Sequence, residues 1–202
     1  IGQETECDAV FASCTNLRTF GVLAEAERRI GKPVVSSNQA LAWHMMRLAG
    51  LESREGNLEK ALELARAIDG KRPKFAAGRM LAGDAYVRAK QFKKALVEYD
   101  AGLKKVDTGA LAIRRFNAQR QAENLDKALA GLQTWVDRKN EVAVRHVLAS
   151  NYISSKRYGD AIRESEKLLK TDQNNPVLLN NLAWLYSEKK DPRAVEYGKK
   201  AL

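Results

Sequence analysis

The stretch FASCTNLRT, from Phe11 to Thr19, places Cys14 at the end of a short apolar run and before a polar turn. If the run is a strand and the turn leads into a helix, the Cys14 thiol meets backbone N–H groups and the positive end of the helix dipole. Both favour a thiolate and an anionic ligand. Such a thiolate can add to an activated alkene or move a proton beside a carboxylate. Cys14 is therefore the candidate nucleophile of this sequence.

The second cysteine, Cys7, lies an odd number of residues before Cys14. In a strand, two side chains at that spacing point to opposite faces, so we expect no disulfide between them. The sequence has no other cysteine and no histidine close to these two, which argues against a zinc site. We therefore predict no metal and no cofactor.

The elements that must position Cys14 follow from the surrounding pattern. CDAVFASC is typical of a short buried strand, and KPVVSS of a second one. Between them, TFGVLAEAERRIG predicts an amphipathic helix that ends at Gly31. NQALAWHMMRLAGL then predicts another helix, with Asn38 as its N-cap. The order strand, helix, strand, helix over the first 51 residues is that of an α/β unit.

SCTNLRT, followed by GKPVVSSNQALAWHMMRLAG, resembles the C-terminal end of the aspartate/glutamate racemase superfamily, in the branch of maleate cis-trans isomerase and arylmalonate decarboxylase. The resemblance implies enzymes with two pseudo-symmetric α/β domains, a cysteine from each facing the substrate, and no cofactor or metal. Cys14 matches the second of these cysteines, and Thr15 and Asn16 match residues that hold a substrate carboxylate. The domain that supplies the partner cysteine has no counterpart here. We therefore expect residues 1–41 to be a partial racemase-like segment without turnover of its own.

Behind this segment, the chain repeats with spacings of 34, 33, 33 and 33 residues between alanines placed early in a second helix. These alanines are Ala61, Ala95, Ala128, Ala161 and Ala194. A second series at the start of the same helices is Leu58, Phe92, Leu125, Tyr158 and Pro192. Each helix pair has an apolar face that a lone hairpin cannot bury. Stacked pairs bury it, so the repeat predicts a continuous helical core.

The pattern resembles the tetratricopeptide repeat (TPR), a helix-turn-helix unit of about 34 residues. The family's small residue and the aromatic three positions later match these pairs: Gly83 and Tyr86, Ala149 and Tyr152, Ala183 and Tyr186. The third unit departs from the pattern, with Phe116 and Gln119 at these places. The resemblance implies a mainly α fold, a right-handed solenoid of about five repeats over residues 42–202, with a short N-terminal α/β (strand-helix-strand) segment. The expected units are 42–75, 76–108, 109–141, 142–175 and 176–202.

The two resemblances overlap, because the first helix of the first repeat falls near Ala42–Arg54, on the last racemase-like helix. The sequence leaves open a natural fusion, a designed one or a joining error. At the other end, NNPVLLNNLAWLYSEKKDPRAVEYGKKAL resembles the TPR lipoproteins of the bacterial exosortase (PEP-CTERM) system. No polar capping helix follows it, so we expect the array to continue in its parent protein.

TPR solenoids bind peptides or protein segments on a concave face lined mainly by their first helices. The family's groove positions fall on Asp84, Arg88, Asn117, Arg120, His146, Ser150, Asn180 and Trp184. Arginine and asparagine there could hold a peptide carboxylate, because a guanidinium fork matches the geometry of a carboxylate. The alternative is that these are ordinary solvated helix residues, with Trp184 packed between repeats.

The formal net charge of +10 falls entirely on residues 52–202, since residues 1–51 are neutral. A basic helical array attracts an acidic partner or nucleic acid, although lysines and arginines that solvate outer helix faces also explain the excess. No stretch of about 18 apolar residues is long enough to span a membrane. IGQETECDAV lacks the pattern of a signal peptide, and the compartment is left open.

These observations predict a non-enzymatic scaffold that binds a protein or peptide ligand on the concave face. If the positive charge of the array determines the choice of ligand, the ligand is acidic. Two alternatives stay open. The first is a maleate isomerase-like isomerase or racemase that needs a further domain with the second cysteine. The second is a basic nucleic-acid-binding array, whose affinity would fall with salt.

Overall fold

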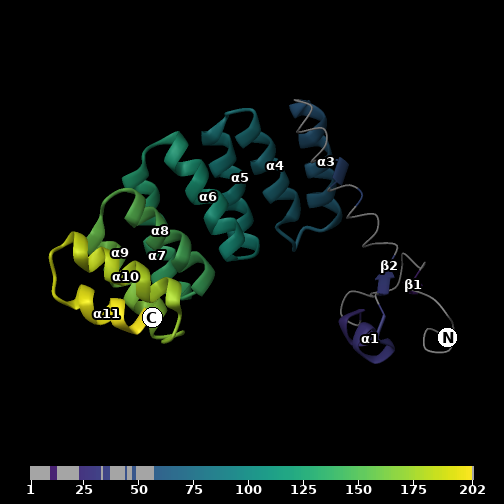
Figure 1. Ribbon diagram of the computed structural model, residues 1–202. Helices are drawn as coiled ribbons and strands as arrows, with labels where there is room; N and C mark the ends of the chain where they lie inside the picture. The colour runs from purple at the N-terminus through teal and green to yellow at the C-terminus, as the bar shows by residue number, and fades with distance from the viewer. Residues whose placement is uncertain are drawn as a thin grey trace. The chain divides into compact units, whose positions relative to one another are not determined.

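The computed structural model describes residues 10–12, 23–32, 34–36, 44, 47, 48 and 57–201. The chain divides into two compact units, Ile1–Ala89 and Lys90–Leu202, each with its own packing. Figure 1 labels their helices and strands. The prediction of a mainly helical fold is confirmed for residues 57–201, and within that range no helix is long and apolar enough to cross a membrane.

The first unit begins with strand β1 (Val10–Ala12), helix α1 (Leu23–Ile30) and strand β2 (Val34–Ser36). The two strands pair in parallel, with Val10 opposite Val34. Glu27 of α1 accepts the Val34 N–H at 3.0 Å, which ties the helix to the second strand. The helix ends at Gly31, whose φ of 71° lies in the left-handed region that glycine enters without a steric penalty.

Two further helices of this unit, α3 (Leu58–Lys71) and α4 (Ala77–Arg88), pack against each other. The Asn57 side chain caps α3 by accepting the Lys60 N–H at 3.3 Å. The interface consists largely of buried alanines, and Gly78 of α4 is buried as well. A Cβ atom at Gly78 would lie only 2.6 Å from the Ala65 carbonyl oxygen, so the close approach of the two helices requires glycine there.

Over residues 90–201, the second unit consists of seven helices that follow one another along the chain (Figure 1). They are α5 (Phe92–Lys105), α6 (Gly109–Ala122), α7 (Leu125–Lys139), α8 (Val142–Ser154), α9 (Tyr158–Leu169), α10 (Pro176–Glu188) and α11 (Arg193–Ala201). We call α6, α8 and α10 the first helices and α5, α7, α9 and α11 the second helices of their repeats. α6 packs beside α8, and α9 packs against both α8 and α10.

The residues that define the repeat pattern form the core of this unit. Ala128 and Ala161 are completely buried, and so are Leu148 and Leu182 in the first helices. Burying one such leucine stabilises the fold by about 1.5–3 kcal/mol. Because the side chains of the repeat alanines are small, the second helices can approach their neighbours closely.

Two tyrosines of the pattern also connect their repeats to the ones before them. The Tyr152 hydroxyl of α8 donates to Gln133 Oε1 of α7 at 3.1 Å. The Tyr186 hydroxyl of α10 donates to Glu166 Oε1 of α9 at 2.5 Å. Burial, followed by the hydrogen bond to the Glu166 carboxylate, raises the pKa of Tyr186 above its usual range, so this hydroxyl stays a donor.

The third predicted repeat, residues 109–141, keeps this connection with different side chains. Arg115 of α6 occupies the repeat position of the core residues Leu148 and Leu182, and its Nε donates to Asp100 of α5 at 2.5 Å. Arg115 Nη1 also donates at 2.8 Å to Gln119, which replaces the tyrosine. The neighbouring Phe116 is buried and takes over the core contact in place of a small residue. The departure seen in the sequence is thus a coordinated exchange of residues.

Candidate functional site

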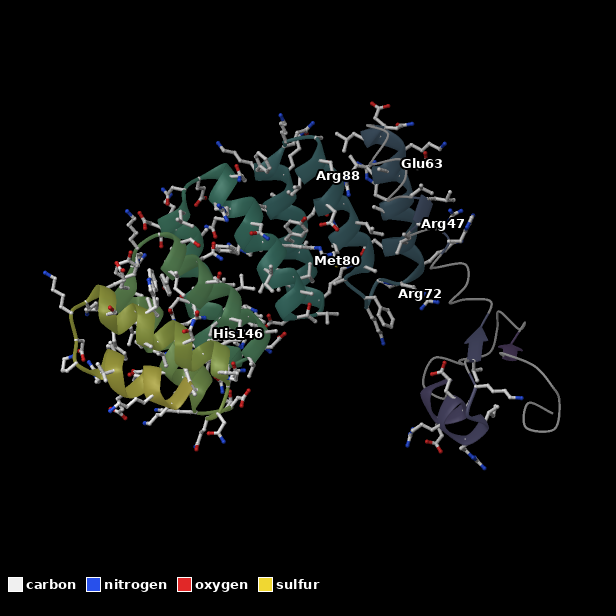
Figure 2. The ribbon with its side chains drawn as sticks, viewed as in Figure 1. Arg47, Glu63, Arg72, Met80, Arg88 and His146 are labelled. Carbon is white, nitrogen blue, oxygen red and sulfur yellow. The ribbon has the colours of Figure 1, made fainter. Side chains whose placement is uncertain are left out.

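The predicted binding residues of the second unit all lie on its first helices and are exposed. We call them the first-helix face, which consists of Asn117, Arg120, His146, Ser150, Asn180 and Trp184. Figure 2 labels His146, the member of this face at the start of α8. Each first helix buries its opposite side in the core, so the exposure follows from the amphipathic pattern.

The spacing places these side chains in two rows. His146 and Ser150 are four residues apart on α8, and Asn180 and Trp184 are four apart on α10. Residues at that spacing are neighbours on one side of a helix. Asn117 on α6 has the same repeat position as Ser150 and Trp184. The first-helix face therefore presents an amide, a hydroxyl and an indole at corresponding positions of successive repeats.

The polar members of this face are available to a ligand. Among the described residues, the side chains of Asn117, Arg120, His146 and Asn180 make no hydrogen bond or ion pair. This contrasts with Arg115 and Arg138 nearby in sequence, whose guanidinium groups are held by carboxylates. Arg120 thus carries an exposed positive charge that no carboxylate in residues 57–201 neutralises.

Trp184 has a partner inside the repeat array. Its ring meets that of Tyr158 of α9 edge to face, with the ring centroids 5.5 Å apart and the planes at 84°. The Trp184 side chain nevertheless remains 43% exposed. It therefore packs between repeats and still offers an apolar surface to a ligand.

The other predicted residues are placed as follows. Asp84 and Arg88 lie on α4 of the first unit, where Asp84 is half-buried and Arg88 is exposed at the helix end (Figure 2). Cys14, Thr15 and Asn16, the predicted nucleophile and carboxylate-binding residues, lie outside the described residues. Within the described part of the chain, no cluster of histidine, cysteine or acidic side chains could hold a metal ion.

One charged cluster that the sequence did not predict connects two repeats of the second unit. Asp107, between α5 and α6, accepts hydrogen bonds from Trp135 Nε1 at 2.7 Å and from Arg138 Nη1 at 2.5 Å. Lys139 Nζ lies 3.2 Å from the same carboxylate. The hydrogen bond from Arg138 is the main reason why the pKa of Asp107 falls from 3.8 to about 2.

A second unpredicted feature is an ion pair in the core between α8 and α9. Arg145 Nη1 donates to Glu164 Oε2, and the two side chains are 6% and 0% exposed. Arg145 also donates to Asn140 Oδ1 at 2.7 Å. Gln133 and Lys167 donate to the other Glu164 oxygen at 3.2 and 3.0 Å. In the sequence, these charges look like any others on a helix surface, so only the three-dimensional packing identifies them.

The N-terminal residues match a known enzyme family. The family model described as arylmalonate decarboxylase matches residues 1–61. A curated relative, the arylmalonate decarboxylase of Bordetella bronchiseptica, is 47% identical over 45 residues. That stretch covers 22% of this chain and 19% of the relative, so the chain spans about a fifth of the length of the curated relative.

The helical part is similar to solved TPR structures. A crystal structure of MamA covers 80% of this chain and 90% of its own, with a TM-score of 0.55 and 16% identity. MamA from Desulfovibrio magneticus RS-1 reaches a TM-score of 0.52 at 17% identity, over 79% of this chain and 92% of its own. YrrB, described as a TPR protein with an unusual peptide-binding site, has a TM-score of 0.51 and 20% identity, over 89% of this chain and 90% of its own. The chain therefore has the fold of TPR proteins and, over its first 61 residues, resembles the arylmalonate decarboxylase family.

Proposed function

We propose that this protein is a non-enzymatic interaction scaffold that binds a peptide or protein segment on its first-helix face. The observation that carries the proposal is the row of exposed polar side chains on α6, α8 and α10 that have no partner among the described residues. A repeat array that only needed solvation could carry charged side chains at these positions. Here the face has one guanidinium group, that of Arg120, beside amides, a hydroxyl, an imidazole and an indole.

The chemistry of these groups fits an extended segment. Asn117 and Asn180 each offer an amide donor and an acceptor, which match the N–H and C=O groups of a peptide backbone. Arg120 offers a guanidinium fork for a carboxylate of the ligand. Trp184 supplies an apolar surface at the far end of the row, where an aliphatic or aromatic side chain would bury area. The ligand we infer therefore carries an acidic side chain and an apolar one.

The fold likeness supports this proposal. YrrB, which shares the fold, is described as having a peptide-binding site, although an unusual one. Because identity to YrrB is 20%, the likeness concerns the fold, and the ligand of this chain has to be determined on this chain.

A peptide array tests the proposal. The labelled protein is incubated with random peptides of about ten residues, and the peptides it retains are measured by fluorescence anisotropy. We expect the retained peptides to contain a carboxylate. The double variant Asn117→Ala/Arg120→Ala should bind them about tenfold more weakly than the wild type does. Arg66→Ala, on the exposed side of α3, removes the same charge elsewhere and should leave the affinity within about twofold. Equal losses in the two variants would contradict the proposal.

A second candidate function rests on the match of residues 1–61 to arylmalonate decarboxylase. In this alternative, Cys14 is the thiol of a half-site, with Thr15 and Asn16 beside a substrate carboxylate. Because the chain spans about a fifth of the curated relative, the half-site would need a further domain with the second thiol. Incubation with phenylmalonate and with maleate tests this: turnover that disappears in Cys14→Ala would make the chain part of an enzyme.

A further inference from the structure

Two second helices of the second unit, α9 and α11, border an open groove that lies apart from the first-helix face. The groove has a volume of about 810 Å³ and is bordered by α9 and α11, with α10 beneath. Its apolar floor consists of Leu169, Leu179 and Tyr197. We call it the α9–α11 groove. None of its lining residues belongs to the first-helix face.

The repeat explains why the floor of the groove is apolar. Leu179 has the repeat position of Arg145, since each stands seven residues before the tyrosine of its first helix. Tyr197 has the position of Glu164, three residues after the repeat alanine of its second helix. One repeat earlier, the space at these positions is filled by the buried Arg145–Glu164 ion pair. Exchange of this pair for Leu179 and Tyr197 removes the internal charges and gives the groove an apolar floor.

The edges of the α9–α11 groove are strongly basic. Arg163, Lys167, Lys170 and Lys200 all line it, against the single carboxylate of Glu166. Glu166 is already engaged, because it accepts the Tyr186 hydrogen bond at 2.5 Å. Lys170 makes no ion pair with any described residue and is exposed.

The other three cations of the groove have carboxylate neighbours on their own helices. Arg163 pairs with Asp160 at 2.8 Å, and Lys200 with Glu196 at 2.6 Å. Lys167 lies 3.0 Å from the buried Glu164. The pairs of Arg163 and Lys200 are half-exposed and contribute little energy, so an acidic ligand can share or displace them at small cost.

We propose that the α9–α11 groove is a second binding site, for an acidic segment of a partner protein that carries an apolar anchor. The cationic edges attract carboxylates. The apolar floor gives an aliphatic or aromatic side chain a place to be buried, which a sugar-phosphate backbone cannot use. The proposal goes beyond the first-helix face because it concerns the other layer of helices and different residues, so either site can fail without the other.

The test uses the full chain and three fluorescein-labelled peptides in fluorescence anisotropy. The probe is EDELFEDE; QNQLFQNQ lacks the charge, and EDEGGEDE lacks the anchor. We expect EDELFEDE to bind, more weakly as salt is raised, and both altered peptides to bind about tenfold more weakly or worse. Weak or absent binding of EDELFEDE at low salt would overturn the proposal, and so would equal binding of EDEGGEDE.

Two variants of equal net charge locate the site. Lys170→Glu/Lys200→Glu reverses two groove cations, while Lys104→Glu/Lys199→Glu reverses two exposed lysines outside the groove lining. We expect the first variant to lose at least about tenfold in affinity for EDELFEDE and the second to stay within about threefold. Equal losses would show a general attraction to positive charge and contradict the site. A thymidine oligonucleotide of equal charge that binds the groove as tightly as EDELFEDE would also contradict it, in favour of nucleic acid.

Discussion

The buried ion pair between Arg145 and Glu164 allows a quantitative test of the packing between repeats. Removal of one partner from a buried pair leaves an uncompensated charge and commonly costs 3–5 kcal/mol, whereas replacement of both partners by apolar residues is often nearly neutral. The chain itself supplies the replacement, because Leu179 and Tyr197 occupy the same positions one repeat later. The variants to compare are therefore Arg145→Leu, Glu164→Tyr and the double variant.

The contacts set the expected magnitudes. Glu164→Tyr leaves Arg145 with Asn140 as its remaining partner, so we expect a loss of about 3 kcal/mol in the free energy of unfolding. Arg145→Leu costs about 2 kcal/mol, because Glu164 keeps its hydrogen bonds from Gln133 and Lys167. If the two costs added, the double variant would lose about 5 kcal/mol. We expect it to lose no more than about 2 kcal/mol, a coupling of about 3 kcal/mol.

Urea unfolding followed by circular dichroism at 222 nm measures the four proteins. Because unfolding of repeat arrays can lose cooperativity, the slope of the transition must stay constant for the comparison to hold. Amide hydrogen exchange in α8 and α9 gives an independent local measure. A double variant that loses the full sum of about 5 kcal/mol would refute the reasoning, since the two side chains would then act independently.

Three further predictions concern single residues. Gly78→Ala should lower the free energy of unfolding by about 1–3 kcal/mol through the clash with the Ala65 carbonyl. Gly70→Ala, with open space around its Cβ, should raise it by up to about 1 kcal/mol, and urea unfolding measures both variants. Asp107→Asn should lower the free energy of unfolding by about 1 kcal/mol above pH 4. Because the folded-state pKa of Asp107 is lowered to about 2, the wild type should lose this advantage as the pH falls from 4 to 2. Urea midpoints of both proteins at several pH values measure this, and a difference that does not change with pH would contradict it. Lys156→Gly should raise the melting temperature slightly, because the φ of 58° at Lys156 is strained for a residue with a Cβ, and a lower melting temperature would contradict that reason.

The sequence predicts the helical fold well because the repeat records which residues are buried. Ala128, Ala161 and Tyr152 were identified from spacing alone and are buried as expected. The sequence also shows that Phe116 departs from the repeat pattern, but it does not show which contact compensates for the departure. That Arg115 and Asp100 replace a tyrosine contact becomes clear only when α5 and α6 are seen side by side.

The candidate sites were predictable to different degrees. The exposure of His146 and Asn180 follows from helix periodicity, since their neighbours Arg145 and Leu179 face the core. The α9–α11 groove could not be predicted, because a pattern of charged residues every three or four positions looks the same on any solvated helix. The groove depends on which residues of α9, α10 and α11 come together, and these lie far apart in the sequence. Cys14 lies outside the described residues, so its role as a half-site stays a prediction.

Peptide binding to the first-helix face can be followed by nuclear magnetic resonance of the side-chain amide groups. An array-selected peptide is titrated into the protein labelled with nitrogen-15, and the shifts of the Asn117 and Asn180 amide groups are followed. Asn124 and Asn175, which cap α7 and α10, serve as internal controls. We expect saturable shifts at Asn117 and Asn180 with little change at the two caps. Saturable binding that leaves Asn117 and Asn180 unchanged would contradict it.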